Sequence, residues 1–218
     1  MKVGIDGVLL GVWAPVENVS RVLDIGTGTG LIALMIAQRS PALIDAIDID
    51  ADAVGQATEN SMNSPWESRI HTQHISLQDL AETTEERYDL IVSNPPYFNN
   101  STKAPAENRT TARHTDSLTH EELIGNAMRL LKPTGRICII LPVNEGLRCV
   151  DFALTKGLSC SRLVKVYPKP NADVKRLLLE FSLTQKQRDD SELVIESDIR
   201  HQYSTEFTGL AKDYYLKL

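Results

Sequence analysis

The sequence predicts an α/β fold: a mostly parallel sheet of seven strands, helices on both faces and an antiparallel hairpin at the end. Short apolar segments alternate with helical patterns over about the first 157 residues, which is typical of β-α-β units. Several of these segments lack any polar alternation, as expected for strands buried on both faces. The last two strands are joined by PKPNADV, which is too short for a parallel crossover, so they must be antiparallel.

The first two strands and helices follow from local patterns. RVLDI at 21–25 is the first strand, and after GTGTG the segment 31–40 has almost no polar face, so it is a helix that packs against the sheet. ALIDAIDI at 42–49 is the second strand. Asp50 can cap a helix over 51–63, whose apolar residues fall roughly on one face.

The middle of the chain adds three strands. RIHTQHI at 69–75 is a weak third strand, and YDLIVSN at 88–94 is a fourth that is fully buried. Thr119 and Glu122 form a capping box that opens a helix reaching to about residue 131. The tetrapeptide KPTG then turns the chain into RICIILP at 136–142, the fifth strand.

The last part completes the sheet. A helix over about 144–156 ends at Gly157. Residues 161–168 and 175–184 are the antiparallel pair, and the tail is a helix docked on the domain through one apolar face. That face comprises Phe207, Leu210, Ala211, Tyr214, Tyr215 and Leu218.

Composition narrows the classes of protein. The 218 residues carry a net charge of −6, which counts against nucleic-acid binding through charge over the whole surface, although a local basic patch is compatible with it. We find no apolar run long enough for a membrane span and no signal peptide. Three scattered cysteines and five histidines show no metal-ligand spacing, so we predict no metal and a cytoplasmic, reducing location.

The glycine loop indicates a nucleoside ligand. Asp24 ends the first strand and is followed by Gly26, Gly28 and Gly30, whose backbone can approach a ligand closely. The spacing G-x-G-x-G differs from that of dinucleotide enzymes, and Asp24 would repel a pyrophosphate but not a ligand with a cationic amino group. Asp48 ends the second strand, where a carboxylate can bind ribose hydroxyls. These features predict S-adenosyl-L-methionine as cofactor.

A third nucleoside contact usually follows the third strand, where a carboxylate meets the adenine amino group. An ungapped reading places Ser76 there, with Asp79 three residues later. We therefore include Ser76 among the cofactor-binding residues, in place of the usual acid.

The segment SNPPYF, residues 93–98, ends the fourth strand at the same edge of the sheet as the glycine loop. Asn94 offers a side-chain carbonyl and Pro95 a backbone carbonyl, and neither proline can donate to a continuing ladder. Two such acceptors can bind an exocyclic amino group and favour a more pyramidal, nucleophilic nitrogen. Tyr97 would stack on a planar base, and Pro96 and Phe98 would line its pocket.

Together, DIGTGTG and SNPPYF resemble the Rossmann-like class I methyltransferases that act on planar amino nitrogens. With MKVGIDGVLLGVWAP at the start and YSTEFTGLAKDYYL at the end, the chain resembles the tRNA1(Val) adenine-37 N6-methyltransferase family over essentially its whole length. The resemblance implies tRNA as substrate, S-adenosyl-L-homocysteine as product, one domain over 1–218 and a monomer. It also predicts that a short family segment before this start is missing here.

Other functions share part of this pattern. Glutamine N5-methylation of a protein also uses NPPY, but that group usually carries a helical domain before the glycine loop. Amino methylation of ribosomal RNA or DNA is a third possibility for an enzyme. A non-catalytic RNA-binding module is disfavoured by the intact Asn94.

The segment after NPPYF contains candidate RNA contacts. Over residues 98–114 the chain has Lys103, Arg109 and Arg113 against one glutamate, next to the expected base pocket. Arg109 and Arg113 are therefore predicted to bind the RNA substrate, since arginine suits phosphate and stacking contacts. A solvated loop with chance charges is the alternative. The lysines around the final hairpin are the next candidates.

Overall fold

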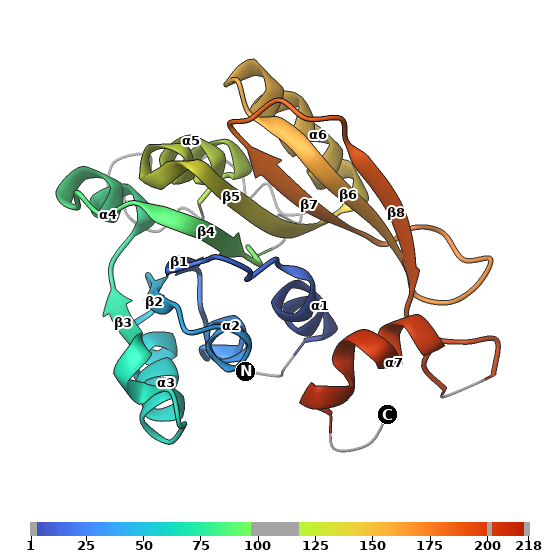
Figure 1. Ribbon diagram of the computed structural model, residues 1–218, viewed down its shortest axis with the longest axis horizontal. Helices are drawn as coiled ribbons and strands as arrows, with labels where there is room; N and C mark the ends of the chain where they lie inside the picture. Colours follow the sequence, from blue (N-terminus) through green and yellow to red (C-terminus); the bar gives the residue numbers. More distant parts are fainter. Residues whose placement is uncertain (1–3, 97–117, 200–201, 216–218) are drawn as a thin grey trace, which may run out of the picture.

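The computed structural model describes residues 4–96, 118–199 and 202–215. Within these ranges eight strands form one sheet in the order β3-β2-β1-β4-β5-β7-β6-β8 (Figure 1). The strands are β1 Arg21–Ile25, β2 Leu43–Asp48, β3 Ile70–His74, β4 Tyr88–Ser93, β5 Leu131–Pro142, β6 Ser159–Tyr167, β7 Arg176–Ser182 and β8 Asp189–Val194. The predicted Rossmann-like fold is confirmed, and it has one strand more than expected.

The first five strands are parallel. From β1 the sheet grows first on one side, with β2 and β3, and then on the other side, with β4 and β5, so the strand order reverses between β1 and β4. Ile25 pairs with Ile47 on one side and with Ser93 on the other, so β1, β2 and β4 end at one level. Ligands of open α/β sheets bind outside the carboxyl ends of the strands at such a reversal. The topology therefore brings the glycine loop and the Asn94 segment together.

The second half of the sheet contains the predicted antiparallel pair and one unpredicted strand. β7 lies between β5 and β6 and is antiparallel to both. β8 adds to the edge, parallel to β6. Its sequence, DDSELV, is polar, and its first four residues are exposed, so it has neither of the apolar patterns by which a strand is predicted.

Helices cover both faces of the sheet, as predicted. In Figure 1, α1, α2, α3 and α7 lie on one side and α4, α5 and α6 on the other. The helices are α1 Ile5–Trp13, α2 Leu31–Arg39, α3 Ala51–Met62, α4 Leu77–Thr83, α5 His120–Leu130, α6 Val143–Thr155 and α7 Thr205–Ala211. Each side has its own apolar core, one including Leu9, Ile36 and Phe207 and the other Leu123, Ile137 and Phe181.

The predicted helix caps are confirmed. The Asp50 side chain accepts hydrogen bonds from Asp52 N and Ala53 N at the start of α3. Thr119 and Glu122 form the capping box of α5. Such caps satisfy backbone N–H groups that have no partner inside the helix. Gly157, with φ of 83°, follows α6 in the left-handed conformation that favours glycine.

Two predicted boundaries are wrong. β5 begins at Leu131, so KPTG belongs to the strand, and the pairing with β4 shifts register between Tyr88 and Leu90. The tail is not one helix face: α7 ends at Ala211 and a 3₁₀ turn follows, leaving Leu210 41% exposed. Phe207 and Ala211 do pack in the core, and Tyr214 and Tyr215 pack against it, so the predicted docking of the tail holds for these four residues. Leu218 lies outside the described residues.

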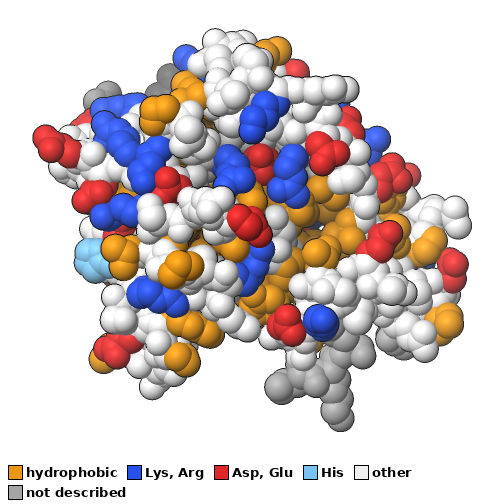
Figure 2. Space-filling model, in the orientation of Figure 1, with side chains coloured by type: hydrophobic (Ala, Val, Ile, Leu, Met, Phe, Trp, Pro, Cys, Tyr) orange, Lys and Arg blue, Asp and Glu red, His pale blue; other side chains and the backbone are white. Residues whose placement is uncertain are grey.

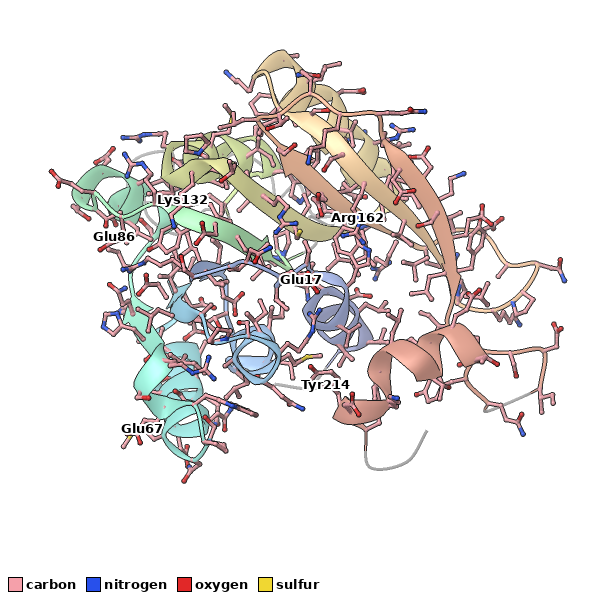
Figure 3. All side chains as sticks on the ribbon, in the orientation of Figure 1. Glu17, Glu67, Glu86, Lys132, Arg162 and Tyr214 are labelled. Carbon is pink, nitrogen blue, oxygen red and sulfur yellow. The ribbon has the colours of Figure 1, made fainter. Side chains whose placement is uncertain are left out.

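Asp89 joins the amino ends of three strands. Its carboxylate accepts hydrogen bonds from Ser20 N at 3.0 Å and Arg21 N at 2.9 Å, and it pairs with Lys132 Nζ at 2.9 Å. Figure 3 labels Lys132 at the start of β5. Burial alone would raise the pKa of Asp89, but the hydrogen bonds outweigh it and hold that pKa well below its ordinary value. This network fixes the edge of the sheet opposite the candidate site.

Candidate active site

A cavity of about 370 Å³ opens at the carboxyl edge of β1, β2 and β4. The glycine loop, the end of β2, the start of α4 and the segment after β4 all contribute to its wall. It is lined by Ile25, Gly26, Gly28, Ile47, Asp48, Ile49, Ile75, Leu77, Gln78, Ser93, Asn94, Pro95, Pro96 and Leu118. The two sequence motifs that were predicted to act together therefore border the same cavity.

The glycine loop turns sharply from β1 into α2. Gly26, Gly28 and Gly30 have backbone φ values of 68°, 58° and 80°, a left-handed region that residues other than glycine rarely adopt. Gly26 and Gly28 line the cavity, whereas Gly30 lies behind them. A Cβ on Gly30 would stand 3.3 Å from the Ala57 Cβ, so this glycine lets the start of α2 approach α3 closely.

Asp24 lies beneath the loop, outside the cavity wall, with 0% of its surface exposed. Its Oδ2 accepts hydrogen bonds from the Thr27 hydroxyl at 2.7 Å and from Ala33 N at 3.2 Å. Its Oδ1 is buried and has no hydrogen-bond partner among the described residues. Burial raises the pKa of Asp24 to about 6, since the hydrogen bonds only partly offset the desolvation of the charged form.

Asp48 lines the cavity and also supports the glycine loop. Its Oδ2 accepts a hydrogen bond from Gly28 N at 2.9 Å, and its Oδ1 accepts one from Asp50 N at 3.0 Å. Each carboxylate oxygen has a further lone pair, so Asp48 can bind hydroxyl groups without releasing the loop.

Ser76 does not line the cavity. It is the N-cap of α4, where its hydroxyl accepts a hydrogen bond from Asp79 N at 3.0 Å and donates one to Asp79 Oδ2 at 2.7 Å. The next two residues, Leu77 and Gln78, form the wall instead. Gln78 is therefore the polar residue from this segment that lines the cavity, while Ser76 as a cofactor contact stays a prediction without support from this geometry.

Asn94 directly follows β4, with α1 behind it. A Cβ on Gly7 of α1 would stand 4.0 Å from Asn94 Nδ2 and 3.1 Å from a methyl carbon of Leu31. The segment Asn94–Pro95–Pro96 borders the cavity throughout. The remaining predicted substrate contacts, Tyr97, Phe98, Arg109 and Arg113, lie outside the described residues.

Sequence reasoning missed the apolar walls. Ile49 is 62% exposed although it is a large aliphatic side chain, and it stands directly after Asp48. An isoleucine at the end of a strand, directly after the aspartate predicted to bind ribose, was an available signal for an apolar wall of the cavity. Leu118 could not have been placed, because it comes from a distant segment just before α5.

Over 4–96, 118–199 and 202–215 no group of three or more His, Cys, Asp or Glu side chains is arranged to hold a metal ion. None of the helices in the described part of the chain is long and apolar enough to cross a membrane.

Comparison with known proteins agrees with the fold. Residues 8–165 match the methyltransferase small domain family. A crystal structure of a predicted O-methyltransferase from Agrobacterium tumefaciens superposes with a TM-score of 0.73, covering 95% of each chain at 16% identity, which shows the shared fold. The fold and the match define a methyltransferase.

Sequence relatives narrow the class. The chain is 51% identical over 219 residues to the tRNA1(Val) (adenine(37)-N6)-methyltransferase of Parabacteroides distasonis, a match that covers 100% of this chain and 92% of that protein. It is 45% identical over 222 residues to the protein of the same name from Bacteroides fragilis, with the same coverage. The chain belongs to the tRNA1(Val) (adenine(37)-N6)-methyltransferase family, which confirms the resemblance found in the sequence.

Proposed function

We propose that this protein transfers a methyl group from S-adenosyl-L-methionine to N6 of an adenine in tRNA, adenine 37 of tRNA1(Val). The observation that carries the proposal is the shared cavity, which Gly26, Gly28 and Asp48 border on one side and Asn94 and Pro95 on the other. Membership of the family, at 51% identity over the whole chain, supports the choice of substrate.

The residues around the cavity fit the cofactor. Asp48 would hold the ribose hydroxyls, and the apolar walls from Ile49 and Leu77 suit the faces of an adenine ring. The unpartnered Oδ1 of Asp24 lies beneath the loop, where a nearby cationic group would stabilise its charged form. When bound, S-adenosyl-L-methionine supplies a methyl group already activated on a sulfonium.

The protein's own contribution is to position and activate the target amine. An adenine N6 is a poor nucleophile because its lone pair is delocalised into the ring. The Asn94 side-chain carbonyl and the Pro95 backbone carbonyl would accept hydrogen bonds from its two N–H groups, favouring a more pyramidal nitrogen. Positioning for in-line attack then supplies most of the rate enhancement, and the proton leaves after the nitrogen becomes cationic, so no strong base is needed.

Further expectations follow from this function. To reach the cavity, the target base must be unstacked or flipped. Tyr97 would stack on it, with Phe98 beside it. We also propose one domain over 1–218 that acts as a monomer in the cytoplasm, where its tRNA substrate is made and used.

The proposal is tested by incubating purified protein with isotope-labelled S-adenosyl-L-methionine and total tRNA, followed by mass spectrometry of the nucleosides. Labelled N6-methyladenosine is expected, with the site mapped by oligonucleotide fragments. Parallel incubations with ribosomal RNA, DNA and a release-factor protein test the alternative acceptors. Label in glutamine of the protein, and none in tRNA, would overturn the assignment.

Asn94→Ala tests the role of the side chain. Methyl transfer should be abolished, because one of the two acceptors for the amine is lost, while affinity for S-adenosyl-L-homocysteine stays nearly intact. Single-turnover rates and calorimetry measure the two quantities. Turnover of the variant at the wild-type rate would contradict the mechanism.

A further inference from the structure

Ser93 is a buried hydroxyl that the mechanism above does not use. It is the last residue of β4, only 2% of its surface is exposed, and it lines the cavity. It pairs in register with Ile25 of β1, and its Oγ donates a hydrogen bond to the Ile25 carbonyl oxygen at 2.9 Å.

This bond stands where the backbone ladder between β1 and β4 ends. In a continuing parallel pair, a backbone N–H of β4 would bind the Ile25 carbonyl. β4 ends at Ser93, and the N–H that this register would place at the Ile25 carbonyl is that of Asn94, for which the described residues show no such hydrogen bond. The Ser93 hydroxyl provides a donor there, so the carbonyl is satisfied while the backbone of the Asn94 segment leaves the sheet.

The two bonded residues are each next to one half of the site. Ile25 directly precedes Gly26 of the cofactor loop, and Ser93 directly precedes Asn94 of the target segment. On the far side, Gly26 N and Thr27 N donate to the Ile47 carbonyl at 2.9 and 3.0 Å, just before Asp48. Hydrogen bonds therefore join the glycine loop to the residue before Asp48, and the residue before that loop to the residue before Asn94.

We infer that Ser93 is a positioning residue, whose hydroxyl sets the spacing between the methyl donor held by the glycine loop and the amine held by Asn94. This inference rests on the proposed function. Misplacing reacting groups by about 1 Å can cost on the order of 100-fold in rate. Losing this bond is expected to lower the rate of methyl transfer, because the bond sets the relative position of the two sides of the cavity. It is not expected to change the affinity for either ligand, because each side binds its own ligand without it.

The test is a single-turnover methylation of tRNA by Ser93→Ala at saturating cofactor. The rate should fall by about 10- to 100-fold. The Kd for S-adenosyl-L-homocysteine and the concentration of tRNA at half-maximal rate should each stay within about twofold of wild type. Ser93→Thr keeps the hydroxyl, so this variant should restore most of the rate.

Ser40→Ala is the matched control. Ser40 is also buried, at 8% exposure, and its Oγ donates to the Ile36 carbonyl at 3.0 Å, but it follows α2 away from the cavity. Thermal unfolding should show similar small losses of stability in both alanine variants, with wild-type rates in Ser40→Ala. An equal loss of rate in the two variants, or a wild-type rate in Ser93→Ala, would overturn the role of Ser93. Failure of the wild-type protein to methylate any acceptor would instead contradict the proposed function.

Discussion

Burial of the Asp24 carboxylate lowers the stability of the ligand-free protein, and the same carboxylate is expected to interact with the cofactor. A carboxylate with no solvent access is poorly solvated, and one of its oxygens has no hydrogen-bond partner among the described residues. Two hydrogen bonds, from Thr27 and Ala33, reduce that cost without removing it. Groups held in such a state often lie at functional sites, where a ligand completes their environment.

The raised pKa predicts a pH dependence of stability. The pKa of Asp24 is about 6 in the folded protein against 3.8 when exposed, so the folded state holds its proton more tightly. The associated stability is fully present below about pH 3.8 and is lost as pH rises through 6. It amounts to about 3 kcal/mol at most, from roughly 1.4 kcal/mol per pKa unit. Asp24→Asn removes this loss, so its unfolding free energy above pH 7 should exceed that of wild type.

Urea unfolding of the ligand-free proteins between about pH 3.5 and pH 7 measures this difference, since the loss falls between the two pKa values. Wild type should lose stability across that range relative to Asp24→Asn. Calorimetry at pH 8 should show weaker binding of S-adenosyl-L-homocysteine to the variant, because its cationic amino group loses an opposite charge. Parallel stability curves for the two proteins would show that Asp24 does not titrate in this range.

The role of a single residue could be predicted from the sequence where its hydrogen-bond partners lie within a few residues along the chain. The caps at Asp50 and Thr119 were predicted because the bonds they make lie within three residues. Ser76 was assigned to the cofactor by counting from the third strand, but its partner is Asp79, at the same cap spacing. The cap motif was visible in the sequence and argues against Ser76 as a cofactor contact.

Among the elements, α1 holds together parts that are far apart in the chain. The guanidinium carbon of Arg162 lies 4.4 Å from the centroid of the Trp13 ring, and Figure 3 labels Arg162 on β6. At the other end of the helix, Asp6 pairs with Arg176 of β7 at 2.8 Å. Between these ends, Gly7 faces Asn94. The helix therefore forms a fixed wall behind the segment that is expected to bind the target base.

Gly7→Ala should disturb that wall. The new methyl group would stand 3.1 Å from Leu31, so Leu31 or the helix must shift, and Asn94 is the next neighbour. We expect turnover to fall by about three- to tenfold through misplacement of Asn94. Cofactor affinity should be nearly unchanged.

Gly55→Ala is the control for this prediction. Gly55 lies inside α3, and a Cβ there meets nothing within 4 Å. Replacing a helical glycine by alanine should stabilise the protein by about 0.5–1 kcal/mol without changing turnover. If Gly7→Ala also raised stability and kept full activity, α1 would be only a structural support.

Two unpredicted elements, α1 and β8, share a physical reason. The segment of α1 contains two glycines, Gly7 and Gly11, which lower helix propensity, yet tertiary packing stabilises it. Gly11 is required by contact, since a Cβ there would meet the Met35 sulfur at 2.6 Å. β8 is similarly defined by its hydrogen bonds to β6 and not by an apolar pattern. Periodicity identified most of the elements that bury one face, but it missed α1 and β8, and it also missed the short α4, which buries Leu77, Leu80 and Ala81.

The whole molecule must bind a polyanion while carrying a net charge of −6. Figure 2 shows basic and acidic side chains interleaved on the face it presents. Attraction of RNA therefore has to come from local groups near the cavity. Two regions offer them: Arg109 and Arg113 in the segment after Pro96, and the exposed Lys169 and Lys175 between β6 and β7. Because β6 runs parallel to β5, that connection leaves the sheet at the same edge as the cavity.

We expect the arginines to make the phosphate contacts, since they are closer in sequence to Asn94. Arg109→Ala combined with Arg113→Ala should weaken tRNA binding and reduce the slope of log affinity against log salt by up to about two, at roughly 0.7–0.9 per contact. Lys169→Ala combined with Lys175→Ala changes the net charge by the same amount and serves as the control. Binding isotherms across a salt series give both slopes, and cofactor affinity should not change in either variant. Equal slopes for the arginine variant and wild type, with a reduced slope for the lysine variant, would instead place the RNA along the β6–β7 connection.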